Sequence, residues 1–196
     1  MAHFSFPARL SFVLIALIGL SACASISAVG PGPVDIGKSY RISTGEIWSK
    51  YPPQNRTNTA ATMTIDGTLL NTLSFVEGLE PGQSIIYTSD RDKLIPKYRA
   101  DMTASELVDF VLDSYSAQGL ANGKMTDLRP EKFDRLDGYR FDFTGAYKSG
   151  LELSGTGKIA QQGDKLHIII FYAPSEYYYG LRKNEVDGIL ASVSLL

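Results

Sequence analysis

The feature that most constrains the fold is a set of three strand-like segments in the C-terminal half of the chain. Residues 139–143 (YRFDF) alternate aromatic and charged side chains, and residues 151–159 begin with a similar alternation. A period of two is typical of a strand with one buried face. Residues 165–173 (KLHIIIFYA) are apolar on both faces, as expected for a central strand. Because short turn-like segments link the three, the pattern predicts an antiparallel three-stranded meander.

Two helices are predicted beside this sheet. Residues 103–106 (TASE) form a capping box, and apolar side chains then recur at helical spacing up to Gly119. A second helix is predicted after Pro174, starting at about residue 175 or 181 and running to Ser192. Helices segregated beside an antiparallel sheet define an α+β layered domain.

The N-terminal half is predicted to add further strands. They are expected at residues 40–48, at residues 58–75 on either side of an Asp66–Gly67 turn, and at residues 84–88. A chain of 196 residues with 44% hydrophobic side chains is long enough for one well-packed domain. We expect that domain to span residues 36–196.

The order of these elements resembles the PsbP-like α/β/α sandwich. The resemblance covers about residues 36–196 and depends on a loose pattern of LDGYRFDF (136–143), a meander and the closing EVDGILASVSL (185–195). This fold occurs in photosystem II extrinsic subunits, in the Ran-binding Mog family and in many small bacterial lipoproteins. The resemblance implies a non-enzymatic accessory or assembly role, and it transfers no set of functional residues.

The first 22 residues are predicted to be a targeting segment. Residues 10–20 are eleven residues long and nearly all apolar. A membrane-spanning helix needs about 20 apolar residues, so this length fits the core of a signal peptide instead.

The chain's one cysteine, Cys23, follows this apolar segment. The sequence Leu20, Ser21, Ala22, Cys23 resembles the bacterial lipobox, in which the signal is removed and the cysteine carries acyl chains such as palmitate. Two or more acyl chains hold a protein firmly on a membrane. The open alternative is a plain secreted protein in which Cys23 has no special role.

The residue after the cysteine bears on sorting. In Gram-negative lipoproteins aspartate at that position favours the inner membrane, so Ala24 implies the periplasmic face of the outer membrane. Residues 23–35 are small, uncharged for most of their length and contain glycine and proline, so we expect the lipidated cysteine to be followed by a flexible tether.

Few residues suggest chemistry. The net charge of −2 gives no basic footprint for nucleic acid. His167 lies inside an apolar strand and is predicted to be a hydrogen-bonded structural histidine. GTGK (155–158) lacks the spacing of a phosphate loop, and its two glycines indicate a bulge, a bend or close packing. We therefore predict no catalytic residue, no metal and no cofactor.

The best candidate contact surface is aromatic. Tyr177, Tyr178 and Tyr179 cannot all face one core, and Trp48 and Tyr51 are candidate additions to a partner or ligand patch. The alternative is that two of the three consecutive rings lie in the core and one lies on the surface.

The function predicted from these observations is that of an outer-membrane-anchored periplasmic lipoprotein. It would act as a non-catalytic accessory or binding factor with a protein partner in the cell envelope. Two alternatives remain open. One is a carrier of a small apolar ligand or lipid between sheet and helices, and the other is a periplasmic hydrolase or transferase acting on envelope polymer.

Overall fold

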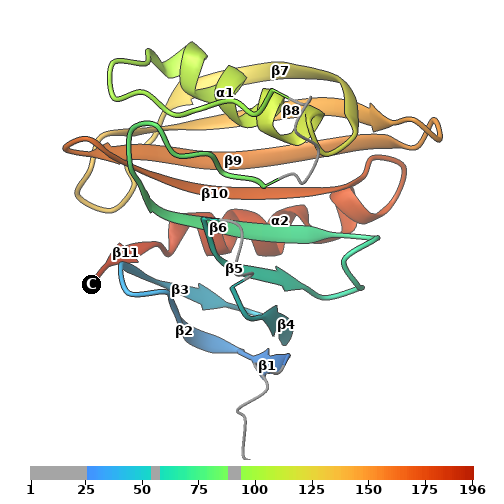
Figure 1. The fold of residues 1–196 in the computed structure, drawn as a ribbon. Coiled ribbons are helices and arrows are strands. Elements are labelled where there is room, and N and C mark those ends of the chain that lie inside the picture. Colours follow the sequence, from blue (N-terminus) through green and yellow to red (C-terminus); the bar gives the residue numbers. More distant parts are fainter. Residues whose placement is uncertain (1–25, 54–57, 88–93) are drawn as a thin grey trace, which may run out of the picture.

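The fold consists of a large antiparallel sheet with one helix on each face and a small sheet beside the second helix (Figure 1). The computed structural model describes residues 26–53, 58–87 and 94–196. In spatial order, the large sheet contains β1 (Ser27–Val29), β4 (Trp48–Tyr51), β5 (Thr59–Thr64), β6 (Thr72–Leu79), β10 (Lys165–Pro174), β9 (Glu152–Gln162), β8 (Gly138–Tyr147) and β7 (Leu120–Pro130). The small sheet contains β11 (Ser194–Leu195), β3 (Tyr40–Thr44) and β2 (Gly32–Ile36).

The first helix, α1 (Ala104–Ser116), begins at the predicted capping box. The Thr103 hydroxyl accepts from the Glu106 backbone N–H, and the Glu106 carboxylate accepts from the Thr103 N–H at 2.8 Å. The helix buries Leu107, Val108 and Val111 with neighbouring apolar residues against one face of the large sheet. We call this the α1 face.

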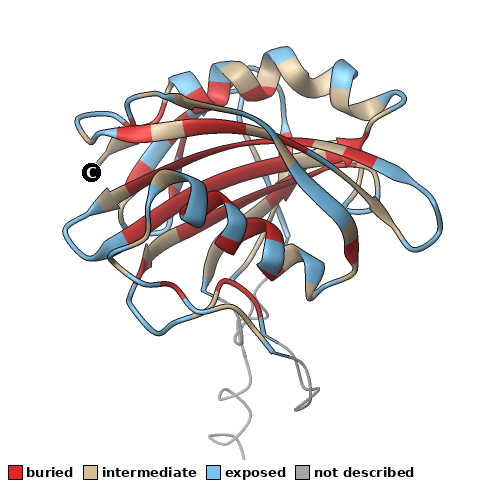
Figure 2. Ribbon diagram, turned by 90° about the horizontal axis from the view of Figure 1, so that it is seen from above, coloured by how far each residue is buried: buried red, intermediate tan, exposed pale blue. Residues whose placement is uncertain are grey.

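The second helix, α2 (Tyr178–Ala191), covers the opposite face together with the small sheet. Val186, Ile189 and Leu190 supply its buried side. They pack with apolar residues of β2 and β3 and of the central strands in a second core cluster. We call this the α2 face. In Figure 2 the buried residues are concentrated on the central strands, and the outer sides of both helices are exposed.

The predicted α+β class is confirmed, and the predicted meander is present as β8, β9 and β10. It is one strand longer than expected, because β7 pairs with β8 along the sheet edge. The sequence of β7, LANGKMTDLRP, has no regular alternation. Its pairing with β8 shifts register twice, and Leu120 is its one fully buried residue, so periodicity could not reveal this strand.

The N-terminal region differs most from expectation. Residues 27–29 and 32–36 form β1 and β2, so the predicted tether over residues 23–35 extends too far into the folded domain. Both strands are held by backbone pairing, β1 to β4 and β2 to β3, which a small-residue composition does not prevent. The strand expected at residues 40–48 is two strands, β3 and β4, which belong to different sheets.

The strand expected at residues 84–88 is also corrected. Residues 84–87 are described and form no strand, while residue 88 lies outside the described residues. This segment bonds to a neighbouring loop through one backbone and one side-chain contact: the Tyr98 N–H donates to the Gln83 carbonyl, and the Ser84 hydroxyl donates to the Pro96 carbonyl. The side chains of Ile85 and Ile86 are buried in the core of the α1 face.

The two glycines of β9 allow close packing, one of the predicted alternatives. A Cβ atom on Gly155 would lie 2.1 Å from the Phe143 ring, and one on Gly157 would lie 2.3 Å from the Phe141 ring. Both rings come from the facing strand β8. The glycines therefore leave space on the α1 face for two aromatic rings to lie across the neighbouring strand.

Candidate functional site

The lipobox residues Leu20, Ser21, Ala22, Cys23 and the sorting residue Ala24 lie outside the described residues. The first described residue, Ile26, comes immediately before β1. Among the described residues, no helix is both long enough and apolar enough to span a membrane. The lipid anchor therefore stays a prediction from the sequence.

The predicted aromatic patch is not one surface. Trp48 is fully buried, and its indole N–H donates to Glu185 at 3.2 Å. Tyr178 and Tyr179 are half-buried against the core of the α2 face, and Tyr177 is 62% exposed. This is the arrangement given as the alternative, with two rings against the core and one at the surface. Trp48 is therefore removed from the candidate patch.

Tyr51 lies elsewhere, on the α1 face, where it lines a hollow between the sheet and the end of α1. Two hollows meet here, with volumes of about 470 and 330 Å³. They share Tyr115, Gln118 and Tyr172 as a common wall. We call the pair of hollows the tyrosine groove. Its remaining lining is Tyr87, Ala117, Leu120, Phe143, Tyr147 and Leu153 on one side, and Tyr51, Pro52, Thr59, Thr62, Thr68, Thr72, Ser74, Ile85 and Ile86 on the other.

Strand register positions the polar lining. Thr62 of β5 pairs with both Tyr51 of β4 and Ser74 of β6, so the three side chains form one row across the sheet. Thr72 of β6 pairs with Tyr172 of β10 in the next row. Because side chains two residues apart share a face, both rows point to the α1 face.

The aromatic lining has a defined geometry. The rings of Tyr115 and Tyr172 meet edge to face, with centroids 5.5 Å apart and an interplanar angle of 72°. In the 470 Å³ hollow, Phe143 is part of the lining, and Gly155 beneath it leaves room for its ring. The groove is thus walled by rings from α1, β8 and β10.

The described lining of the groove is uncharged. None of its described lining residues carries a charge at neutral pH. Burial raises the pKa of Tyr115 well above its ordinary value and that of Tyr172 to about 12. Both phenols therefore stay protonated and can donate as well as accept hydrogen bonds. By contrast, the hollow beside His167 is lined by Lys38, Glu77 and Lys165 among others.

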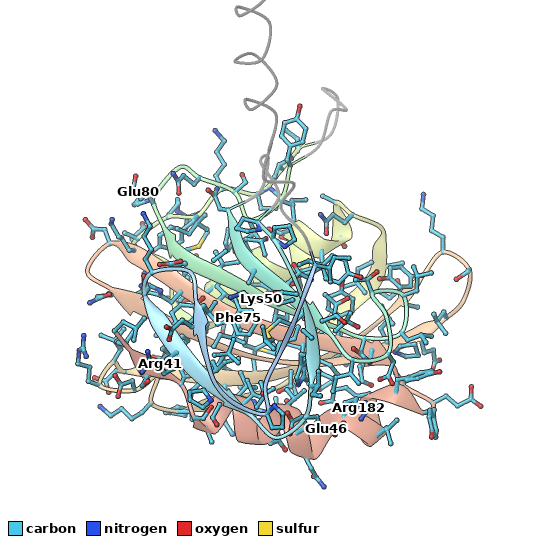
Figure 3. All side chains as sticks on the ribbon, turned by 90° about the horizontal axis from the view of Figure 1, so that it is seen from below. Arg41, Glu46, Lys50, Phe75, Glu80 and Arg182 are labelled. Carbon is cyan, nitrogen blue, oxygen red and sulfur yellow. The ribbon has the colours of Figure 1, made fainter. Side chains whose placement is uncertain are left out.

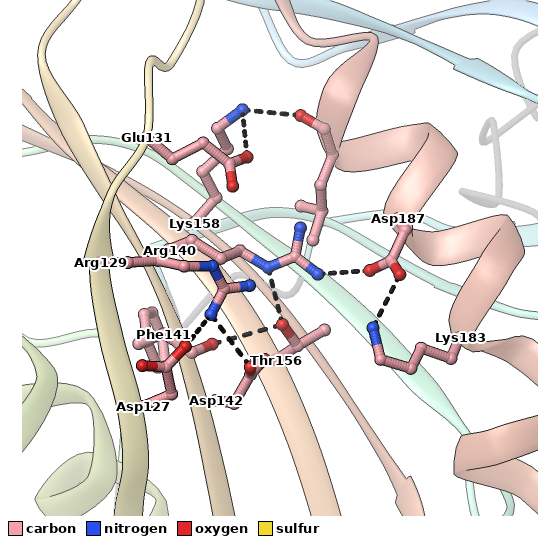
Figure 4. Close-up of polar contacts among 11 residues, drawn as sticks. Asp127, Arg129, Glu131, Arg140, Phe141, Asp142, Thr156, Lys158, Lys183 and Asp187 are labelled. Carbon is pink, nitrogen blue, oxygen red and sulfur yellow. Dashed lines mark hydrogen bonds and ion pairs between the residues drawn. The ribbon is translucent and has the colours of Figure 1, made fainter.

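The α2 face carries ions instead (Figure 4). Arg140, with a side chain 5% exposed, donates to the Thr156 hydroxyl at 2.8 Å and forms an ion pair with Asp187 of α2. Lys158, 4% exposed, contacts the Glu131 carboxylate at 3.0 Å and donates to the Leu190 carbonyl at 2.9 Å.

These contacts tie the helix to the sheet. Burial opposes ionisation of Asp187, but hydrogen bonds from Lys183 and Arg140 outweigh it, so the pKa of Asp187 is lowered. Each buried cation has a specific acidic partner, as burial of a charge requires. We assign this network a structural role.

A second ion cluster fastens the start of α2 to two loops. Arg182 donates to both carboxylate oxygens of Asp66, at 2.8 and 2.7 Å, and also contacts Glu46. Arg182 and Glu46 lie next to each other in Figure 3. The hydrogen bond from Arg182 lowers the pKa of Asp66. This contact also joins regions 116 residues apart in the sequence.

His167 is buried, as predicted, with 2% exposure. It is packed between the rings of Tyr40 and Phe133, whose centroids lie 5.9 and 6.1 Å from its own. Its Nδ1 atom has no hydrogen-bond partner among the described residues, so that nitrogen does not contribute to the predicted hydrogen bonding. Burial lowers its pKa, which favours the neutral imidazole.

The sequence did not reveal the groove. A signal existed in the threonine-rich stretch of residues 57–72, TNTAATMTIDGTLLNT, but it reads equally as an exposed strand face. Tyr115, in the first helix, and Tyr172, in an apolar strand, meet only because of tertiary packing.

Comparisons with known proteins support the fold. No family model matches the sequence, and no curated protein matches it. The structure is similar to the solution structure of cyanobacterial PsbP (CyanoP) from Synechocystis sp. PCC 6803, with 14% sequence identity and a TM-score of 0.56. That match covers 93% of this chain and 99% of CyanoP. This likeness shows that the chain has a PsbP-like fold, as the sequence resemblance predicted.

Two weaker similarities were also found. A crystal structure from Bacteroides thetaiotaomicron gives a TM-score of 0.45 at 9% identity, covering 83% of this chain and 49% of that one. LpqN, involved in cell envelope biogenesis of Mycobacterium tuberculosis, gives a TM-score of 0.37 at 12% identity, covering 87% of this chain and 90% of LpqN.

Proposed function

We propose that this protein is a lipid-anchored, non-catalytic binding protein of the bacterial cell envelope, and that the tyrosine groove is its binding site. Cys23 would carry the acyl chains, and Ala24 would direct the protein to the periplasmic face of the outer membrane. The domain would then serve as an accessory factor that holds a ligand or a segment of a partner.

The observation that carries the binding role is the groove itself. Pockets that hold small ligands are commonly about 300–1,000 Å³, apolar and aromatic, with a few placed polar groups. Hollows of about 470 and 330 Å³ lined by tyrosines and hydroxyls fit that description. The lining offers shape and neutral hydrogen bonds, which are means of recognition.

The fold is consistent with an accessory role. CyanoP, whose structure is similar over 93% of this chain, is a PsbP protein, and the PsbP-like resemblance implies assistance to a larger assembly. The groove also favours a second candidate, the carrier of a small ligand between sheet and helix, because it lies where that hypothesis needs a cavity.

The anchor is tested by Cys23→Ala in a two-membrane bacterium. We expect the wild-type protein to incorporate labelled palmitate and to fractionate with the outer membrane. The variant should incorporate none and should leave the membrane fraction. Ala24→Asp is the matched control, because it should keep the label and move to the inner membrane. Continued membrane attachment of Cys23→Ala without label would contradict the proposal.

The binding role is tested by filling the groove. Ala117→Trp places a large ring on a half-buried position of the groove wall, beyond the end of α1. We expect the protein to remain anchored and folded but to lose crosslinks to its envelope ligand or partner. Unchanged crosslinks in this variant would show that another surface does the binding.

A further inference from the structure

On the basis of the binding role proposed above, we propose that the tyrosine groove takes a neutral saccharide. The short segment between Cys23 and β1 would place the groove against a membrane that presents this sugar as a lipid headgroup.

The charge of the lining selects a neutral ligand. Burying an ionised group costs much free energy unless an opposite charge pairs with it. The described lining of both hollows offers no such charge, and the phenols of Tyr115 and Tyr172 stay protonated. A phosphate, carboxylate or ammonium group would therefore find no opposite charge among the described lining residues.

The hydroxyl rows select a ligand rich in hydroxyl groups. Thr62, Thr72 and Ser74 line the smaller hollow from the neighbouring strands β5 and β6. The Thr72 hydroxyl donates to the Thr68 carbonyl at 3.1 Å, and Ser74 and Thr72 hydrogen-bond with Tyr115 and Tyr172. The remaining acceptor sites of this hydroxyl network complement a ligand rich in hydroxyl donors. Neighbouring strands lie about 4.8 Å apart, a spacing comparable with the width of a sugar ring.

The paired rings suit a ligand with an apolar ring face. Tyr115 and Tyr172 form a corner in which the rings are inclined at 72°, and Tyr147 and Phe143 continue the aromatic wall. A pyranose has an axial face of C–H groups that packs on an aromatic ring, while its equatorial hydroxyls point outward. A purely apolar ligand would form no hydrogen bond with this hydroxyl lining.

The short segment from Cys23 to Ile26 determines where the groove would lie relative to the membrane. Ser27 pairs with Lys50, so Ile26 continues toward the end of β4 that carries Tyr51, a groove residue. Cys23 precedes Ile26 by three residues. Three residues span at most about 11 Å when fully extended. An acylated Cys23 would therefore hold the Tyr51 end of the groove close to the lipid surface.

The test uses the lipidated full chain, with ring-labelled tyrosine, in nanodiscs of phosphatidylcholine. One set of discs contains glucosyldiacylglycerol and the other does not, and no glycoside detergent is used in purification. We expect the glucosyl lipid to shift the ring resonances of Tyr115 and Tyr172 and to leave that of the exposed Tyr177 unchanged. Methyl glucoside added to plain discs tests a free sugar as the source.

Matched threonine variants make the test specific. Thr62→Val with Thr72→Val removes two hydroxyls while preserving shape, and we expect it to weaken binding at least about tenfold. Thr144→Val is the control, because Thr144 is exposed and follows the groove residue Phe143, so its side chain lies on the other face of β8. It should bind as the wild type does.

Each outcome bears on the proposal. Shifts with the glucosyl lipid or with methyl glucoside, lost in the double variant, support a saccharide, and the more effective probe identifies its source. No shift with either, or an equal response to the charged methyl glucuronide, would overturn it. If a fluorescent fatty acid shifts the same rings while the sugars do not, the saccharide is excluded but the binding role of the groove stands.

Discussion

The two faces of one sheet differ in how they handle polar side chains. On the α2 face, one row of paired residues runs across neighbouring strands from Phe75 and Ile169, in the apolar core, to Lys158 and then Arg140. Apolar side chains are therefore replaced by charged ones toward β8. On the α1 face, the row through Tyr51, Thr62 and Ser74 contains rings and hydroxyls.

The difference indicates a division of roles. The buried cations of the α2 face are matched by acids on α2 and in the loop after β7, and the contacts of Arg140 and Lys158 with α2 fasten the helix to the sheet. The hydroxyls of the α1 face line open hollows and need no counter-charge. Both faces carry an apolar core cluster, but the α2 face adds ion pairs, whereas the α1 face adds the groove for which we propose a binding role.

The largest expected effect is on the α2 face. Arg140→Met removes the buried cation that donates to the Thr156 hydroxyl and pairs with Asp187, which is left with Lys183 alone. Breaking a buried ion pair costs about 3–5 kcal/mol, and the 38% exposure of Asp187 reduces this to about 2–3 kcal/mol. Denaturant unfolding measures the change.

A double variant sharpens this result. Arg140→Met with Asp187→Leu removes both charges, and we expect it to recover most of the lost free energy of unfolding. If the double variant were no more stable than Arg140→Met alone, the ion pair would not be the source of the loss.

A smaller loss is expected when the aromatic packing of the α1 face is disturbed. The new methyl group of Gly155→Ala would lie 2.1 Å from the Phe143 ring and 2.8 Å from the Phe171 carbonyl oxygen. Overpacking of this kind costs about 1–3 kcal/mol. We expect the free energy of unfolding to fall by about 2 kcal/mol, as measured by thermal unfolding. The loss should be the same at about pH 5 and about pH 8, because no ionisable group is involved. A strongly pH-dependent loss would contradict the contrast between the faces.

The third effect depends on pH. Hydrogen bonding from Arg182 lowers the pKa of Asp66 in the folded state. This contribution to stability is therefore present above the unfolded pKa of about 3.9 and is lost as pH falls through the folded pKa. Asp66→Asn should lower the free energy of unfolding by about 1–2 kcal/mol at neutral pH.

The difference between wild type and Asp66→Asn should then shrink steadily below about pH 4, where the wild-type carboxyl becomes protonated. Urea unfolding across this pH range gives both values. A difference that stays constant down to the lowest pH would show that Asp66 acts through packing and not through its charge.

The smallest effect is a gain. Gly188 lies on the exposed side of α2, and a Cβ atom there would meet nothing within 4 Å. Gly188→Ala should stabilise the protein by about 0.5–1 kcal/mol, because alanine has the higher helix propensity. A rise in the melting temperature is expected, and a fall would mean that the outer surface of α2 is not free.

Local signals in the sequence predicted the parts of the fold that depend on short-range patterns. The apolar segment of β10 and the capping box at Thr103 each specify an element from neighbouring residues. Trp48 was misjudged because its burial depends on α2, whose Glu185 lies 137 residues away.

The groove depends on longer-range information still. Thr62 and Tyr172 reach the same face only through the registers of β5, β6 and β10, and Tyr115 reaches it through the packing of α1. No pattern within one segment records these registers. Even so, Tyr51 was predicted from the sequence as a contact residue, and the structure places it in the lining of the groove.

The central claim is that the α1 face binds and the α2 face stabilises, and photocrosslinking in the native envelope tests it most directly. A benzophenone amino acid is placed at Gln118, an exposed position on the groove wall, and in a second strain at the exposed Tyr177 beside α2. We predict a defined adduct from position 118 that the Thr62→Val, Thr72→Val background diminishes, and none from position 177. An adduct from position 177 with none from position 118 would contradict the account.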